Sequence, residues 1–230
     1  MLAAEGARVV VAARPSDRLE ALATEIGGVS IPTDLSTAEG PSTAVSSAVA
    51  ALGGLDLLLV NSGGPPPGKF EDVTDEAWQK AIDGTLWSTV RLIRAALPHL
   101  RKSDRGSILV ILSSSVREPI AALTTSNVLR PGLAGLIKSL VPEIAPVRIN
   151  GIAPGRVATD RIATLDAGRA ATAGISVEEV QQQTIARIPL GRYGESDEVG
   201  RIGAFLLSSA ASYVTGAIVA VDGGMIRSLP

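Results

Sequence analysis

The chain has 230 residues, of which 46% are hydrophobic and 19% charged, and its formal net charge is −2. These values are typical of a globular protein with a substantial core, and they argue against a disordered chain or a basic surface that binds nucleic acid. The absence of cysteine excludes a disulfide framework and a thiolate metal site, and no apolar run approaches the ~20 residues of a membrane span. We therefore expect a cytoplasmic protein that forms a single domain, residues 1–230, with no metal site and neither nucleic-acid nor membrane partners.

Short apolar runs alternate with helical patterns along the first half of the chain. Strands are predicted at 7–13, 29–32 and 55–60, and helices at 16–26 and in the segment that ends at Leu52. Ser16 is placed to cap the first helix, and Gly27 lies just past its end. Pro41 suits the first turn of the second helix.

The second half of the chain continues this alternation. Strands are predicted at 107–112, 147–153 and 217–222, and helices at 75–97, 126–141 and 197–208. The helix at 75–97 is expected to kink or break around Gly84, and residues 161–190 are expected to form an irregular, partly helical insertion. Because apolar strands alternate with helices, the predicted fold class is α/β, with a parallel, doubly wound sheet.

The segment at 106–141 has the pattern of an active-site region. Its apolar run from Ile108 to Leu112 ends in three serines, and a helical pattern follows after an irregular stretch. Open α/β sheets bind their ligands at the carboxyl ends of parallel strands. Small hydroxyl side chains at such a strand end are therefore candidates for the chemistry.

This segment resembles the active-site region of the short-chain dehydrogenase/reductase family, especially members similar to 3-oxoacyl-[acyl-carrier-protein] reductases. Aligning LRPGLAGLIKSL with the family's SKAALxGLxKSL places Arg130 at the catalytic lysine, Ser126 at the catalytic tyrosine and Ser113 at the serine that orients a carbonyl. The segments APGRVATD, GRYGESDEV and YVTGAIVAVDGG extend the resemblance over residues 2–227. It implies a Rossmann-type fold in which both members of the family's Tyr-x-x-x-Lys pair are substituted.

The family's first strand and its glycine-rich turn, T-G-x-x-x-G-x-G, have no counterpart in this sequence. The opening MLAAEGARVVV resembles the end of the helix that follows that turn. Two interpretations remain open for this difference. We favour a truncated product over a naturally shortened form with weakened cofactor binding.

The resemblance also implies cofactor-binding residues, each of which has a plainer alternative. Arg14, after the first predicted strand, suits the 2′-phosphate of NADP(H), which we favour over NAD(H); otherwise it is a surface arginine. Asp34 matches the family's adenine contact, or is simply a turn residue. Asn61 and Gly63, in NSGG, match the Asn-Asn-Ala-Gly loop, in which asparagine braces neighbouring strands and glycine admits the cofactor ribose; otherwise the segment is a glycine turn before the triple proline.

The segment APGRVATD matches the family's P-G-x-x-x-T motif beside the nicotinamide. Its matching residues are Pro154, Gly155, Val157 and Thr159. Without the resemblance, the same residues would be an ordinary Pro-Gly turn. Thr85 occupies the place of a helix asparagine that holds a water in the family's proton relay. The insertion at 161–190 matches the family's substrate loop.

The two substitutions leave two functions open. The aliphatic hydroxyl of Ser126 is much less acidic than a phenol, whereas Arg130 stays charged and can still grip the cofactor ribose. Water held by Ser113 and Ser126 offers another route for the proton. We favour an NAD(P)-dependent oxidoreductase with an altered proton donor, acting on a small carbonyl or hydroxy compound such as a 3-oxoacyl thioester. The alternative is a non-catalytic member of the family that binds nucleotides or serves assembly.

The resemblance further implies a homo-oligomer, either a tetramer or a dimer. The helices at 75–97 and 126–141 correspond to those that pack the family's subunits together. They carry more apolar side chains than one core needs. These are Trp87, Leu92, Leu133, Leu136 and Ile137.

Overall fold

The computed structural model describes residues 1–228, and its strands pair in parallel. They are β1 (Val10–Ala13), β2 (Val29–Pro32), β3 (Leu57–Val60), β4 (Ser107–Ile111), β5 (Arg148–Pro154) and β6 (Ile218–Val221). One sheet has the order β1-β2 and the other β3-β4-β5-β6. The predicted parallel α/β class is confirmed. The single sheet that we expected is divided, because β1 and β3 do not pair with each other among the described residues.

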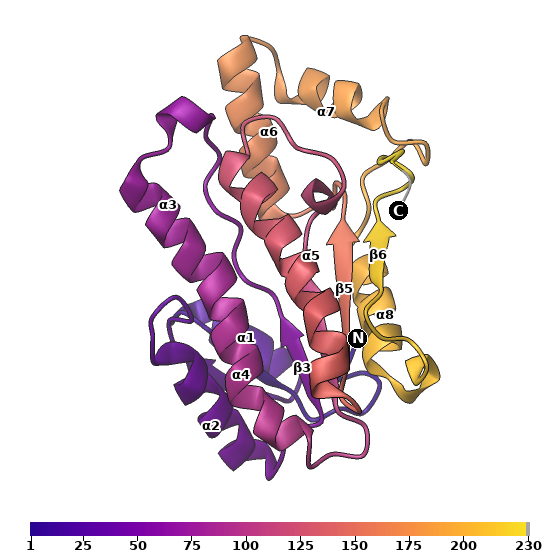
Figure 1. The fold of residues 1–230 in the computed structure, drawn as a ribbon. Helices are drawn as coiled ribbons and strands as arrows, with labels where there is room; N and C mark the ends of the chain where they lie inside the picture. The colour runs from indigo at the N-terminus through magenta and orange to yellow at the C-terminus, as the bar shows by residue number, and fades with distance from the viewer. Residues whose placement is uncertain (229–230) are drawn as a thin grey trace.

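Helices cover both faces of the larger sheet, as its apolar strands predicted. They are α1 (Asp17–Glu25), α2 (Gly40–Leu52), α3 (Asp75–Ala81), α4 (Ser88–Leu100), α5 (Thr124–Ile144), α6 (Asp160–Ala173), α7 (Val177–Ile185) and α8 (Ser196–Leu207). Short helical turns are η1 (Phe70–Asp72), η2 (Ile82–Trp87), η3 (Ser114–Val116) and η4 (Ser209–Ala211). Helices α4 and α5 lie on one face and α8 on the other, while α6 and α7 lie above the carboxyl ends of the strands (Figure 1).

The main core lies between the larger sheet and the helices α2, α4 and α5. Its fully buried side chains include Leu100, Ile108, Leu133, Ile137 and Ile149. Burial of each contributes about 1.5–3 kcal/mol to the free energy of unfolding. A smaller cluster on the α8 face consists of Leu109, Ile152, Leu206 and Leu207. The two clusters hold the larger sheet between two helical layers.

Three side chains that we assigned to a subunit face belong to the main core instead. Leu92 is 7% exposed, and Leu133 and Ile137 are fully buried. They lie on the sides of α4 and α5 that face the sheet, so they cover strands rather than a second subunit. Of the remaining two, Trp87 is 41% exposed and Leu136 is half-buried.

The helix predicted at 75–97 is longer than expected and does not break. It continues to Leu100 through α3, η2 and α4. Around Gly84 the chain takes π-helical turns, over Ile82–Trp87, where we expected a kink or break. Such π-helical segments are frequent at functional sites, and this one carries Thr85.

Local signals in the sequence account for several helix ends. Ser16 Oγ accepts a hydrogen bond from Leu19 N at 3.2 Å and caps α1, as predicted, and Pro41 lies in the first turn of α2. The insertion expected to be irregular is mostly helical, and a capping box of Ser176 and Glu179 starts its second helix, α7. No helix within residues 1–228 combines the length and apolar character needed to cross a membrane.

Candidate active site

Ser113, the predicted carbonyl-orienting residue, lies just past the end of β4. Its backbone is extended, with φ −160° and ψ 157°, and its Oγ accepts a hydrogen bond from Ser115 N at 3.2 Å. This bond caps the short turn η3. Because the oxygen of Ser113 takes the bond, its hydroxyl hydrogen stays available to another acceptor.

Ser126, at the position of the catalytic tyrosine, lies in the first turn of α5 and is 6% exposed. Its Oγ lies 3.4 Å from the Oγ of Ser115, and either hydroxyl can donate. We did not assign a role to Ser115 from the sequence, where only its place in a run of serines pointed to it. The structure thus brings two buried hydroxyls together next to Ser113.

Arg130 lies one helical turn after Ser126 on α5 and is 5% exposed. Its Nη1 donates to Ile111 O at 2.6 Å, and its Nη2 donates to Ser62 O at 3.1 Å. The guanidinium therefore joins the chain at the carboxyl ends of β3 and β4. Burial, with a smaller contribution from the positive charge of Arg161, lowers the pKa of Arg130 to about 10. Arg130 is still protonated at neutral pH.

The chain after β3 is also supported from the π-helical segment η2. Thr85 is 1% exposed, and its Oγ1 donates to Gly63 O at 3.4 Å. Asn61 is exposed, and its side chain makes no hydrogen bond within residues 1–228. The bracing of neighbouring strands that we expected from Asn61 is therefore provided by Arg130 through Ser62.

Arg161, to which we assigned no role from the sequence, reaches the same stretch from the first turn of α6. Its Nη1 donates to Gly64 O at 3.0 Å, and its Nη2 donates to Pro65 O at 2.9 Å. A Cβ on Gly64 would lie 2.4 Å from this guanidinium, so the glycine leaves room for the side chain of Arg161 in its observed position. We call residues Ser62–Pro65 the β3 loop. Side chains from α5, η2 and α6 hold its successive carbonyls.

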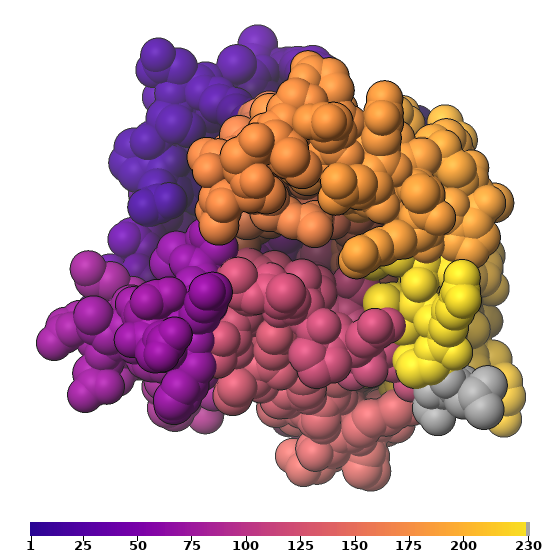
Figure 2. Space-filling model, turned by 90° about the horizontal axis from the view of Figure 1, so that it is seen from above, coloured from indigo at the N-terminus to yellow at the C-terminus, as the bar shows by residue number. Residues whose placement is uncertain are grey.

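The first turn of α6 also contacts α1. Asp160 forms an ion pair with Arg18 of α1 at 2.7 Å, and both side chains are 85% exposed. Seen from above, the surface is hollowed between the orange α6–α7 segment and the pink segment that contains η3 and α5 (Figure 2). We call this hollow the groove.

The segment after β5 forms the turn that the sequence predicted. Pro154 ends β5, and a Cβ on Gly155 would lie 2.6 Å from Asp222 Cβ, so the close approach of the chain just after β6 requires glycine. Val157 continues into an isolated parallel bridge. Thr159 is the N-cap of α6, and its Oγ1 donates to Val157 O at 3.3 Å. These residues thus orient the first turn of α6.

Arg14 and Asp34 follow β1 and β2, and both side chains are exposed. Asp34 accepts hydrogen bonds from Ser36 Oγ at 2.7 Å and Ser36 N at 2.9 Å. These bonds, with a minor contribution from the charge of Arg14, lower the pKa of Asp34. Arg14 has no hydrogen bond or ion pair of its own within the described part of the chain. The structure therefore places a cation near a turn aspartate whose pKa is lowered.

A buried cluster that we did not predict anchors α6. Asp166 is fully buried and accepts hydrogen bonds from Arg156 Nη1 at 3.3 Å and from Tyr193 OH at 2.8 Å. Desolvation, together with the bond to Asp166, raises the pKa of Tyr193. The cluster joins α6 to the chain after β5 and to the chain before α8. Its members are far apart in sequence, so no local sequence pattern predicts the cluster.

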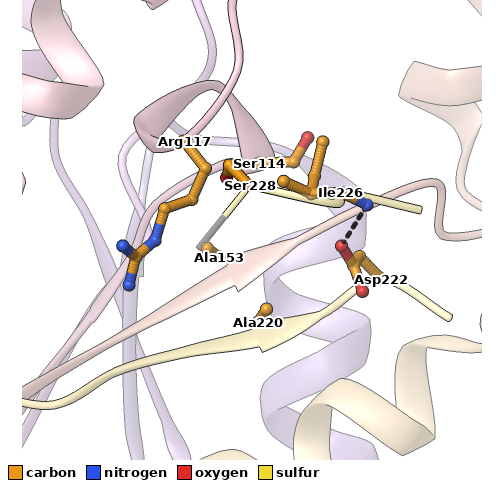
Figure 3. Close-up of a pocket in the computed structure, with 7 residues that line it drawn as sticks. All are labelled: Ser114, Arg117, Ala153, Ala220, Asp222, Ile226 and Ser228. Atoms are coloured by element: carbon orange, nitrogen blue, oxygen red, sulfur yellow. Dashed lines mark hydrogen bonds between the residues drawn. The ribbon is translucent and has the colours of Figure 1, made fainter. Parts of the chain in front are cut away.

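A cavity of about 160 Å³ lies between β5, β6 and the chain that follows β6 (Figure 3). Its lining consists of Ser114, Arg117, Ala153, Ala220, Asp222, Ile226 and Ser228. None of the predicted site residues contributes to this lining. The cavity thus borders η3 through Ser114 but is not lined by Ser113, Ser126 or Arg130.

A parallel α/β fold with polar side chains at the carboxyl ends of its strands is typical of dinucleotide-binding enzymes. Residues 1–226 match the family model described as Enoyl-(Acyl carrier protein) reductase. The chain is 34% identical to Dehydrogenase/reductase SDR family member 4 of Bos taurus, a match that covers 99% of this chain and 81% of the relative. It is 30% identical to 3-oxoacyl-[acyl-carrier-protein] reductase of Aquifex aeolicus, covering 97% of this chain and 89% of that protein.

A solved structure agrees with these sequence relatives. The NADPH-bound structure of a short chain oxidoreductase from Pseudomonas aeruginosa PAO1, described as containing an atypical catalytic center, superposes with a TM-score of 0.88 at 28% identity. The match covers 99% of this chain and 90% of that one. The chain belongs to the short-chain dehydrogenase/reductase family and is an oxidoreductase, which confirms the resemblance seen in the sequence.

The residues around the groove fit a nicotinamide cofactor in their chemistry. A Cβ built on Gly63 meets nothing within 4 Å, so a flat group can approach the backbone there. The unpaired cation of Arg14 suits a phosphate. The described residues contain no glycine-rich turn that would hold a pyrophosphate between β1 and β3. These residues therefore fit the two ends of a dinucleotide, but the described residues provide no turn for its pyrophosphate.

Proposed function

We propose that the protein interconverts a small carbonyl compound and the matching secondary alcohol with NADP(H), at a site formed by Ser113, Ser126 and Arg130. The observation that carries this proposal is the hydroxyl pair of Ser115 and Ser126 at the carboxyl end of β4, one helical turn from a buried guanidinium. The bound cofactor supplies or accepts the hydride. A 3-oxoacyl thioester is one substrate of this class.

Each residue of the site has a defined task in this proposal. Ser113 donates its free hydroxyl hydrogen to the substrate carbonyl, because its oxygen is already bonded to Ser115 N. The paired hydroxyls of Ser115 and Ser126 hold the water that delivers the proton, since a serine hydroxyl is too weak an acid to do so directly. The positive charge of Arg130 stabilises the negative charge that develops on the substrate oxygen and holds the cofactor ribose.

The cofactor extends along the groove from these residues toward β1 and β2. Arg14 binds the 2′-phosphate, which favours NADP(H) over NAD(H). The other residues that we propose to contact the cofactor are Asp34, Asn61, Gly63, Pro154, Gly155, Val157 and Thr159. The helical insertion at 161–190 covers the groove and selects the substrate. The whole chain acts as one domain.

The experiment measures NADPH oxidation with a panel of ketones and 3-oxoacyl thioesters. Ser113→Ala should lower kcat by about 10²–10³-fold, because a preorganised donor to the carbonyl is lost, while the Kd for NADPH stays unchanged. Ser139→Ala, an exposed serine on α5, is the matched control and should retain full activity. Equal activity of the Ser113→Ala variant and the unmutated protein would contradict the assignment.

A second variant tests the altered proton donor. Ser126→Tyr combined with Arg130→Lys restores the family's pair and should raise kcat on simple ketones, by up to the ~10²–10⁴-fold typical of a positioned general acid. If this double variant binds NADPH but gains no activity, the non-catalytic alternative takes the place of our proposal.

A further inference from the structure

Two guanidinium groups lie against the β3 loop without an acidic partner. Arg130 holds the carbonyl of Ser62, and Arg161 holds those of Gly64 and Pro65. The ion pairs within residues 1–228 involve neither arginine. The charge of Arg161 acts on Arg130 and lowers its pKa, so the two cations are close enough to repel each other.

Two other partly buried arginines differ from this arrangement. Arg148 is also held by carbonyls alone, but only burial, and no neighbouring cation, lowers its pKa. Arg156 is 15% exposed in its side chain and faces the carboxylate of Asp166. At the β3 loop, neutral carbonyls satisfy hydrogen bonds but leave the net charge of two cations uncompensated. A charge removed from water is normally balanced by an opposite charge. The two cations at the β3 loop can therefore accept an anion. The described residues do not supply one.

Arg161 can reach such an anion. Its residue is exposed, and the two carbonyls take only one N–H from each of its terminal nitrogens. The rest of its planar donor set, including Nε–H, has no acceptor within the described chain, and it matches the two oxygens of a carboxylate. The nearby positive charge of Arg130 adds to that of Arg161.

We propose that Arg161, backed by Arg130, binds the carboxylate of the substrate, so that the substrate is a short oxo acid or the matching hydroxy acid. This inference rests on the proposed function, which places the carbonyl at Ser113 and Ser126. Ser126 and Arg130 are one helical turn apart on α5, a rise of ~5 Å. Arg161 holds the same β3 loop as Arg130, so the carboxylate and the carbonyl bind near each other, as a short oxo acid requires.

A phosphate of the cofactor is the other anion with matching chemistry. The unpaired cation after β1, Arg14, already suits a phosphate, whereas Arg161 holds the β3 loop together with Arg130 of the proposed reaction site. We therefore assign the arginine pair to the substrate.

The test compares acids with their uncharged esters. We expect kcat/KM for 2-oxobutanoate or 3-oxobutanoate to exceed that for its methyl ester by at least about tenfold, and Arg161→Gln to reduce this ratio by about 10–100-fold through loss of a charge-assisted pair. Arg161→Lys keeps the charge without the fork and should fall between the two. Arg94→Gln, at an exposed arginine of α4, is the matched control and should change nothing.

Binding without turnover provides an independent measurement. Malonate has two carboxylates but no ketone. In the presence of NADPH it should raise the Tm of the unmutated protein but not that of the Arg161→Gln variant. If that pattern holds while no carbonyl is reduced, the anion site stands and the proposed activity fails. Equal use of acids and esters, with no Tm shift by malonate, would overturn the inference. So would an Arg161→Gln variant that binds NADPH more weakly but keeps its preference for acids.

Discussion

Arg130 illustrates how one substitution changes the task of a position. A lysine would offer a compact ammonium, whereas the planar guanidinium donates in two directions, to Ile111 O and Ser62 O. The residue is therefore both a cation of the proposed site and a brace between two strand ends.

We predict that Arg130→Lys destabilises the protein. A single ammonium cannot bond both carbonyls, so one of them loses its charged donor inside the protein. The free energy of unfolding should fall by about 1–3 kcal/mol. Urea denaturation measures it, with the exposed Arg94→Lys as control. An unchanged midpoint for Arg130→Lys would mean that the brace contributes nothing to stability.

A second residue-scale prediction concerns Arg14. If its free guanidinium meets the 2′-phosphate, the unmutated protein binds NADPH more tightly than NADH, and Arg14→Asp reverses the order by repulsion of the phosphate. Fluorescence titration with both cofactors measures the two Kd values. Arg117→Asp, at another exposed arginine, controls for net charge. Equal affinities of the unmutated protein for NADPH and NADH would contradict the assignment of Arg14 to the 2′-phosphate.

At this scale, sequence spacing predicted some positions and missed others for a physical reason. Ser126 and Arg130 are four residues apart on one helix, so their shared face follows from helical geometry alone. The contacts of Ser115 with Ser126 and of Arg161 with the β3 loop depend on how distant segments pack. Neither contact leaves a periodic trace in the sequence.

Among the elements, two glycines should respond to alanine in opposite directions. A Cβ on Gly84, in the π-helical segment, meets nothing within 4 Å, whereas a Cβ on Gly155 would lie 2.6 Å from Asp222 Cβ. Gly84→Ala should raise the free energy of unfolding by about 0.5–1 kcal/mol, since alanine restricts the unfolded chain. Gly155→Ala should lower it by about 1–3 kcal/mol through overpacking. Thermal melts compare them, and the same sign for both would contradict the prediction.

An ion pair at the N-terminus of α8 should make the stability of the protein depend on pH. Glu198 accepts hydrogen bonds from both terminal nitrogens of Arg192 and from Glu195 N, and the bonds from Arg192, first among the causes, lower its pKa to about 2. As pH falls, the unfolded chain takes up this proton before the folded protein does. The contribution of Glu198 to the free energy of unfolding is therefore complete above about pH 4.5 and is lost as the pH falls toward about 2.

We therefore expect Glu198→Gln to lower the Tm at neutral pH and to flatten its decline between about pH 5 and 2. Thermal melts across this range measure it. Glu178→Gln, at an exposed glutamate in the first turn of α7, should leave the decline as steep as in the unmutated protein. A decline of the same slope in all three proteins would exclude this ion pair as its source.

Helix types were predictable because their periodicity is local, but the course of one helix was not. A glycine at position 84 signals a break from sequence alone. The neighbouring turns stay joined because Thr85, Ser88 and Thr89 bond to carbonyls of the β3 loop and of the helix itself. A tertiary contact at Thr85 thus accompanies π-helical turns in place of a kink.

For the whole molecule, we predict a dimer or tetramer formed through the outer faces of α4 and α5. Val128 is 57% exposed and Trp87 is 41% exposed, and they lie on or next to these helices. Val128→Glu should shift the protein toward the monomer, because a charge is desolvated at the interface. Val29→Glu, a 45% exposed valine on β2, is the control. Light scattering at micromolar concentration measures the oligomeric state. A monomeric unmutated protein would contradict the prediction.

The alternation of elements predicted the parallel fold class because each strand needs a crossover helix to reach its neighbour. It did not predict the division into two sheets, since pairing depends on which edges meet in space. Helix α2 packs on β1 and β2 of the smaller sheet and on α4, and α4 in turn packs on β3 of the larger sheet. Helix packing, rather than strand pairing, joins the two sheets within the described residues.

The ion pair between Arg18 and Asp160 has a consequence for how quickly ligands exchange. Both side chains are 85% exposed, so water and salt screen the attraction, which is worth about 0–1 kcal/mol. The bridge therefore favours the bridged arrangement by no more than about fivefold. If a dinucleotide binds in the groove as we propose, this ion pair adds little resistance to its entry or exit. We then expect the residence time of the cofactor to be governed by its own contacts, and not by opening of the Arg18–Asp160 ion pair.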